Sequence, residues 1–301
     1  MTADGEGPNG QPPTRSARRP PPGRVAPEAL AAARGGAVEG LAWLGRTPES
    51  RGPVLYHVLR LVGRALIFGI FRFRISTSGQ ELLPSGGGYH LVAAAHRGWI
   101  DPFVVMHAVP PEPRCWFLGS APSTFTARWR EVLIHRLGGL LPVWRGGIGV
   151  EQHVASARAV LGNCGVFAQM PEGTVSGPSG RLGALRTGWA IIALRTDAPI
   201  VPLAMAGTEE LYLGRRLASQ VLPPTTVRSL AGLPPDASLP EPGSRAELDL
   251  ARVMTDRLAA ILGPVVEALY AGTVDPPDHP RRLRRRLTWL LIRPGRLDRQ
   301  G

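Results

Sequence analysis

Short apolar runs alternate with helical patterns through the middle of the chain, and this alternation limits the fold more than any other feature. The runs of strand length are residues 89–95, 115–119, 165–170 and 200–205, and the helical patterns are residues 125–137, 150–161 and 185–195. Strands that alternate with helices are typical of a parallel sheet with helical crossovers. We therefore expect one α/β domain with a mostly parallel sheet flanked by helices.

The composition divides the chain into three parts. Residues 1–48 are rich in Pro, Gly, Ala and Arg and lack an unbroken apolar core, so we predict that they are disordered. Residues 49–272 are long enough for one α/β core. They include a Pro-rich excursion at 220–245 before a closing helix at 246–269. Residues 273–301 form a basic C-terminal tail.

A histidine and an aspartate stand where a predicted strand gives way to a predicted helix. His96 follows the run at 89–95, and Asp101-Pro102 is typical of a helix N-cap with a proline in the first turn. On one continuous helix the two side chains would point about 140° apart, whereas a loop turning at Gly98 lets them meet. A carboxylate facing the imidazole holds one tautomer and leaves the other nitrogen free to take a proton. The alternative is that Asp101 only caps the helix and His96 only fills space.

Two later motifs add groups suited to a phosphate and a polar pocket. LLPVWRGG contains Arg145, and QMPEGTVSG places Glu172 in a Pro-Glu-Gly-Thr turn. A guanidinium is planar and can hold a phosphate through two parallel hydrogen bonds. Read alone, Arg145 is compatible with a surface charge and PEGT with an ordinary turn. Together with His96 and Asp101 they suggest acyl transfer to a hydroxyl on a phosphorylated acceptor.

The four motifs resemble those of the glycerolipid acyltransferase superfamily, whose best-known members are the lysophosphatidic acid acyltransferases. The resemblance covers roughly residues 74–207. The family blocks are matched in order by His96 with Asp101, by GGLLPVWR with Arg145, by residues 170–176, and by APIVPLAMAG with Pro202. This resemblance implies the single-domain glycerol-3-phosphate acyltransferase-like fold.

The resemblance also implies a reaction. His96, oriented by Asp101, deprotonates an acceptor hydroxyl, which attacks the thioester of acyl-CoA or of acyl carrier protein. The implied acceptor is 1-acylglycerol-3-phosphate and the product phosphatidic acid, with no cofactor beyond the acyl donor. The same chemistry on another lipid or a secondary metabolite is one alternative, and a noncatalytic basic protein that binds lipid or nucleic acid is another.

The remaining site residues take their roles from the resemblance as well. It implies that Arg145 binds the acceptor phosphate, that Glu172, Gly173 and Thr174 shape the acceptor pocket, and that Pro202 lines the acyl-donor side. No motif for a metal site is present in the sequence.

The chain departs from the family pattern at three positions. Val175 stands where the family commonly has an arginine, and Ala95 and Gly98 stand where it has asparagine and serine. Losing a charge-assisted contact costs about 1.5–3 kcal/mol unless another group replaces it. We expect Arg181 or Arg186 to be that replacement, and Arg186 is favoured because GALRTGWA resembles the basic stretch that follows the third block in relatives.

The charge indicates an anionic surface as partner. All 35 basic residues are arginine and the formal net charge is +12, a balance that favours phospholipid headgroups or nucleic acid. Residues 281–293 join a basic cluster to apolar side chains, which suits a membrane interface better than a nucleic-acid-binding tail. We therefore expect an anionic phospholipid membrane as partner and no nucleic acid.

Residues 49–73 are predicted to form an amphipathic helix. Apolar residues recur at helical spacing within 54–73: Leu55, Leu59, Val62, Leu66 and Ile70. The arginines Arg60, Arg64 and Arg72 argue against a simple membrane span. We expect the helix to lie in the headgroup region with its arginines pointing outward, at the cytoplasmic face of the cell membrane, as a peripheral or monotopic attachment. The alternative is a helix packed on the catalytic core.

Two cysteines sit in apolar runs. Neither Cys115 nor Cys164 has another cysteine near it in the sequence, so we expect buried thiols in a reducing compartment rather than a disulfide or a metal pair.

Overall fold

The structure is a computed structural model that describes residues 51–120, 139–143, 150–175, 180–209, 211–212 and 214–274. The predictions made for residues 1–48, 125–137 and 281–293 lie outside the described residues, and so does the prediction for Arg145.

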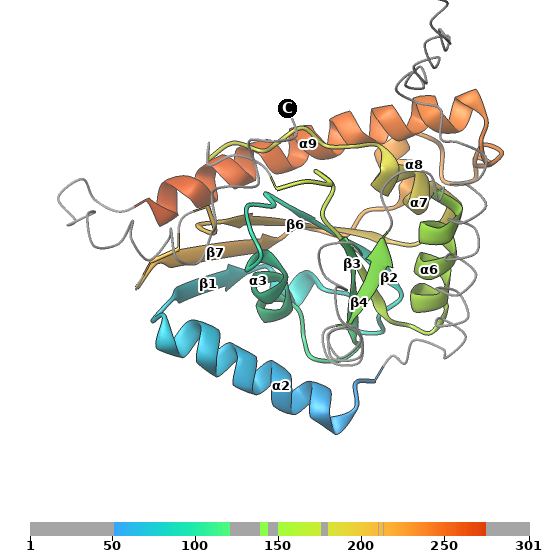
Figure 1. The fold of residues 1–301 in the computed structure, drawn as a ribbon. Coiled ribbons are helices and arrows are strands. Elements are labelled where there is room, and N and C mark those ends of the chain that lie inside the picture. Colours follow the sequence, from blue (N-terminus) through green and yellow to red (C-terminus); the bar gives the residue numbers. More distant parts are fainter. Residues whose placement is uncertain are drawn as a thin grey trace, which may run out of the picture.

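Seven strands form one sheet in the described part of the chain (Figure 1). They are β1 (Arg74–Ser78), β2 (Tyr89–Ala94), β3 (Cys115–Ser120), β4 (Leu140–Val143), β5 (Val166–Gln169), β6 (Ile200–Ala206) and β7 (Arg216–Val221). Their order across the sheet is β1-β7-β6-β2-β5-β3-β4. Every neighbouring pair is parallel except β6 and β7. The predicted mostly parallel sheet is confirmed.

The central strands are the ones whose sequences are almost entirely apolar. Every residue of β2 and of β6 is buried, as expected for parallel strands that are covered on both faces. β1, at one edge of the sheet, instead alternates between exposed and half-buried positions along RISTS. The edge strand therefore lacks the apolar signal that marks the centre.

Helices cover both faces of the sheet (Figure 1). On one face lie α3 (Asp101–Ala108), α2 (Val54–Arg64) and the π-helical turn η1 (Ala65–Ile70). A 3₁₀ turn, η2 (Gln80–Leu82), lies between β1 and β2 in the chain. On the other face lie α6 (Val150–Gly162), α7 (Gly188–Thr196), α8 (Val227–Ala231) and α9 (Arg245–Thr273). Leu91 and Ala93 of β2 pack toward α3, whereas Val92 and Ala94 pack toward α7 and α9. The predicted closing helix is confirmed as α9.

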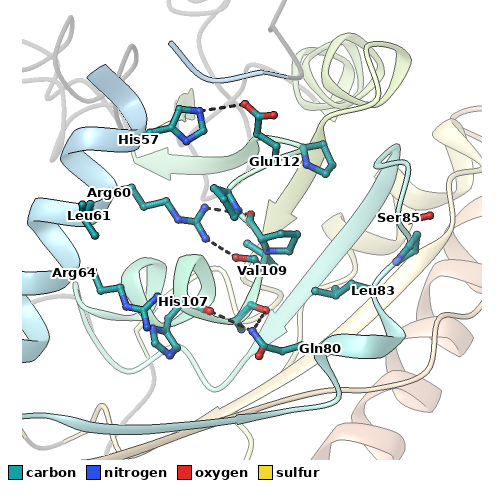
Figure 2. A pocket seen from close by; sticks show the side chains of 15 residues that line it. His57, Arg60, Leu61, Arg64, Gln80, Leu83, Ser85, His107, Val109 and Glu112 are labelled. Carbon is teal, nitrogen blue, oxygen red and sulfur yellow. Dashed lines mark hydrogen bonds and ion pairs between the residues drawn. The ribbon is translucent and has the colours of Figure 1, made fainter. Parts of the chain in front are cut away.

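The N-terminal helix α2 is attached to the domain by its polar side. Arg60 donates hydrogen bonds to the carbonyl oxygens of Val109 and Pro110 at the end of α3 (Figure 2). It also donates to the Met106 carbonyl oxygen and, at 3.0 Å, to the Tyr56 hydroxyl. The last carbonyls of a helix lack partners within the helix and carry partial negative charge, so a guanidinium stabilises them. The prediction that the arginines of this helix point outward is wrong for Arg60.

The apolar side of the same helix faces away from the domain. Seven apolar residues of α2 and η1 are exposed: Val54, Leu55, Val58, Leu61, Val62, Leu66 and Ile70. Leu61 is 69% exposed, whereas Tyr56 is 1% exposed. Among the described residues, no helix is both long enough and apolar enough to cross a membrane.

The two cysteines differ in their surroundings. Cys115 is buried, as predicted, and burial raises the pKa of its thiol to about 12. Cys164 is exposed, so the prediction of a buried thiol is wrong there. It lies in the turn after α6 with a φ of +58°, outside the regular elements that form the core.

Candidate active site

The structure brings His96 and Asp101 together. His96 Nδ1 lies 2.6 Å from Asp101 Oδ2, across the loop that joins β2 to α3. The Asp101 side chain is fully buried, and that of His96 is 20% exposed. Since the loop supplies the turn that one continuous helix would not, the predicted pairing of the two groups is confirmed.

A single carboxylate oxygen orders the whole loop. Besides His96 Nδ1, Asp101 Oδ2 accepts hydrogen bonds from the backbone N–H of Arg97 at 2.6 Å and of Gly98 at 2.8 Å. Asp101 is the first residue of α3 and Ile100 is its N-cap, so the helix begins one position earlier than the sequence predicts. A negative charge in the first turn of a helix is favourable.

The pairing determines which nitrogen of the imidazole is available. A carboxylate accepts hydrogen bonds only, so His96 Nδ1 carries the proton and Nε2 keeps its lone pair. Within the described residues, Nε2 makes no hydrogen bond. The partly exposed Nε2 is therefore placed to take a proton from an incoming hydroxyl.

Glu172 lies beneath the same loop. Its Oε1 accepts hydrogen bonds from the backbone N–H of Ala95 at 2.8 Å and of His96 at 3.2 Å, and the residue is 2% exposed. Burial raises the pKa of the Glu172 carboxyl, and the hydrogen bonds from its own turn and from Ala95 and His96 oppose that rise. These contacts hold the backbone that carries His96, and the expected role of Glu172 in shaping the acceptor pocket stays a prediction.

The backbone that Glu172 holds has an unusual conformation. Ala95 has a φ of +72°, in the left-handed region, which costs an L-residue roughly 1–2 kcal/mol. The contact arises because β2 and β5 are parallel neighbours in register, with Val92 opposite Gln169, so that residues following the two strands meet at one edge. The motif identifies Glu172, but nothing in the local sequence indicates its contact with Ala95.

Arg186 lies over the turn that contains Glu172. Its Nε donates to the Glu172 carbonyl oxygen at 3.2 Å, and its backbone N–H donates to the Pro171 carbonyl at 2.9 Å. Gly173 has a φ of +66°, and a Cβ at this position would lie 2.9 Å from Arg186 Cδ. Thr174 is exposed beside them. The predicted residues Glu172, Gly173, Thr174 and Arg186 thus come from one turn and the segment packed on it.

Arg181, the other candidate replacement for the missing arginine, points elsewhere. Its Nε lies 4.0 Å from Glu267 Oε1 on α9, and its side chain is 82% exposed. Its carbonyl oxygen accepts a hydrogen bond from Arg97. Arg186 rather than Arg181 therefore adjoins the turn at Glu172.

Pro202 is buried within the sheet. It lies in β6 opposite Val92 of β2, and its carbonyl oxygen accepts a hydrogen bond from the Leu222 N–H at 2.9 Å. The residue therefore belongs to the strand next to the one that carries His96. Its contact with the acyl donor stays a prediction.

A large cavity lies away from these groups. It measures about 590 Å³ and is lined by α2, by residues 80–85 and by residues 107–113 (Figure 2). His107 faces it beside Arg64, and burial, aided by the charges of Arg64 and Arg60, lowers the pKa of His107. Neither His96 nor Asp101 lines this cavity, so it is separate from the candidate active site.

Comparisons with known proteins agree with the fold. Residues 74–206 match the family model described as Acyltransferase. Among solved structures, the chain is similar to the 1-acyl-sn-glycerophosphate (LPA) acyltransferase, PlsC, from Thermotoga maritima, with a TM-score of 0.53 and 19% sequence identity over 72% of this chain and 79% of that chain. A comparison with curated protein sequences gives no match. The matched family segment agrees closely with the one expected from the motifs.

Proposed function

We propose that the protein acylates the free hydroxyl of a lysophospholipid, from the premise that residues 74–206 match the family model described as Acyltransferase. The proposed acceptor is 1-acylglycerol-3-phosphate and the product is phosphatidic acid. The acyl donor is a thioester, acyl-CoA or acyl carrier protein. The observation that carries the proposal is the 2.6 Å contact between His96 Nδ1 and the buried Asp101 carboxylate.

In the proposed mechanism, His96 Nε2 takes the proton of the acceptor hydroxyl as its oxygen attacks the thioester carbonyl. The Asp101 carboxylate stabilises the imidazolium that forms. When the tetrahedral intermediate collapses, the carbon–sulfur bond breaks and the departing thiolate takes the proton from His96. A positioned base of this kind typically contributes 10²–10⁴ in rate.

The acceptor phosphate is proposed to bind arginine at the turn around Glu172. Arg186 Nε donates a hydrogen bond to the Glu172 carbonyl oxygen, and within the described residues the two terminal nitrogens of Arg186 make no hydrogen bond. A guanidinium with two free terminal NH₂ groups suits a pair of phosphate oxygens. Arg145 is proposed to join it, as the family resemblance implies.

Another lipid as acceptor is the second candidate, and Val175 favours it. An apolar side chain stands where the family commonly has a phosphate-binding arginine, and it is only partly buried in the structure. An acceptor without a terminal phosphate would lose less binding energy when valine replaces that arginine. A panel of acceptors with and without the phosphate distinguishes the two candidates.

The catalytic test replaces the base. We expect His96→Ala to lower the transfer of a radiolabelled acyl group to 1-acylglycerol-3-phosphate by at least 10², and Asp101→Asn to lower it similarly because an amide favours the wrong tautomer. The control is His153→Ala, a half-buried histidine of α6 outside the site. Retained transfer by folded His96→Ala would overturn the proposed role of His96, and transfer to none of the acceptors would overturn the function.

The proposed location is an anionic membrane surface on the cytoplasmic side. The exposed apolar residues of α2 and η1 supply an insertable face, and the formal net charge of +12 supplies attraction to anionic headgroups. Together they favour a lipid surface over a protein partner, because a protein interface would not require an excess of positive charge.

A further inference from the structure

Two arginines stand side by side at the start of β1 and of β7. Arg74 and Arg216 are paired in register across these parallel strands, and both are exposed. Residues paired in this way project from the same face of a sheet, and like charges placed there destabilise it. In the described part of the chain, neither guanidinium has an ion pair or a side-chain hydrogen bond. The pair thus offers several N–H donors to an anion.

A cavity opens between this pair and the end of α9. It measures about 310 Å³ and is lined by Arg74 and Arg216, by the residues that follow them in β1 and β7, and by the last turns of α9. The space exists because small side chains line it: Ser76, Ala218, Ala268 and Gly272. A largely apolar slot with two guanidinium groups among its lining fits a ligand that joins a ring to phosphate groups.

The cavity lies at the catalytic end of the sheet. β2 and β6 are parallel, so they end at the same edge, and β7 begins there because it is antiparallel to β6, with Ala206 opposite Ala218. β7 is two strands from β2, and β1 is three strands away. With neighbouring strands about 4.8 Å apart, the two arginines are displaced from the strand of His96 by about 10 and 14 Å.

This displacement favours a ligand whose phosphate groups lie far from its reacting group. In 1-acylglycerol-3-phosphate the reacting hydroxyl and the phosphate are on adjacent carbons, so a hydroxyl at His96 Nε2 keeps its phosphate close to His96. The acyl donor differs, because its thioester is joined to the phosphates of CoA through a long flexible arm.

We propose that Arg74 and Arg216 bind the phosphate groups of acyl-CoA, with the nucleotide end of CoA in the adjoining cavity. This proposal rests on the proposed acyl transfer and selects CoA over the carrier protein as donor. A small cavity with paired guanidiniums suits a compact nucleotide, whereas a carrier protein would need a broad basic surface.

The test measures CoA binding to the full chain by calorimetry, without an acceptor, alongside the KM for acyl-CoA. We expect the double variant Arg74→Gln/Arg216→Gln to weaken binding of CoA and of adenosine 3′,5′-bisphosphate at least tenfold. The KM for acyl-CoA should rise more than the KM for the acceptor. The matched control is Arg245→Gln/Arg252→Gln, which removes two exposed charges that pair with Asp249 at the other end of α9.

Unchanged CoA affinity in the folded double variant would overturn the proposal, and so would a loss confined to phospholipid vesicles or to acyl carrier protein. If the double variant does not fold, Arg216→Glu tests the same site, because it gives Arg74 an acidic partner across the strands. Because calorimetry needs no acceptor, CoA binding that depends on the two arginines would stand even if acyl transfer to lysophospholipids failed.

Discussion

Glu172 shows how one buried carboxylate can support a base without a hydrogen bond to the imidazole itself. Its Oε1 holds the N–H groups of Ala95 and His96, whereas Oε2 is buried without a hydrogen-bond partner in the described residues. A buried oxygen without a partner is costly, more so when charged. Glu172 thus holds the backbone at Ala95 and His96, at a cost in stability.

The pH dependence of stability follows from that cost. Burial raises the pKa of Glu172 in the folded state above its ordinary value of 4.5, so between the two pKa values the folded protein binds more protons than the unfolded chain. Stability from this group is therefore lost as pH rises. We expect Glu172→Gln, which keeps one acceptor oxygen and removes the charge, to gain stability relative to wild type as pH rises above 4.5, measured by urea unfolding.

Activity provides the companion measurement for this position. Because one amide oxygen can still accept from Ala95 and His96, Glu172→Gln should keep kcat within about tenfold of wild type. Glu172→Ala leaves both N–H groups without a partner and should lower kcat much further. Equal losses of kcat in the two variants would show that the charge itself is needed, contrary to a positioning role.

At the level of residues, the sequence predicts contacts between residues of the same motif. His96 and Asp101 are five positions apart, and a loop between a strand and a helix is enough to bring them together. The contact of Glu172 with Ala95 depends on β5 being the neighbour of β2, which is decided by the packing of the whole sheet. No pattern near either residue encodes that register.

At the level of elements, predictability follows burial. β2 and β6 are predicted because strands covered on both faces are apolar throughout. β1, β4 and β7 are missed: RISTS and RLASQV are rich in small polar residues, and LLPV is short and contains a proline. The amphipathic character of α2 is predicted from its spacing, but its orientation is not, because the carbonyls at the end of α3 that attract Arg60 are distant in sequence.

The attachment of α2 to the domain depends on Arg60. We expect Arg60→Gln to lower the free energy of unfolding by about 2 kcal/mol, since hydrogen bonds from a charged group to several carbonyls are lost. Hydrogen exchange in α2 should rise at the same time. Arg64→Gln, one turn later, is the control because the Arg64 side chain makes no hydrogen bond within the described residues. Equal protection of α2 in both variants would contradict this attachment.

At the level of the whole molecule, charge and apolar exposure should act together on lipid. We expect wild type to float with vesicles containing anionic phospholipid and to bind less as NaCl rises from 0.1 to 1 M, because the screening length falls from about 10 to about 3 Å. Leu55→Ser/Leu61→Ser should weaken binding at every salt concentration, since it removes two exposed apolar residues of α2. Equal binding of neutral and anionic vesicles would contradict the electrostatic part.

The three hydrogen bonds that converge on Asp101 Oδ2 have a kinetic consequence. With no substrate bound, the imidazole of His96 is already oriented and the adjoining backbone N–H groups are already engaged. Neither substrate has to spend binding energy on assembling the general base. Turnover should then be governed by how quickly two apolar substrates bind and the products leave, rather than by a slow rearrangement of the catalytic loop.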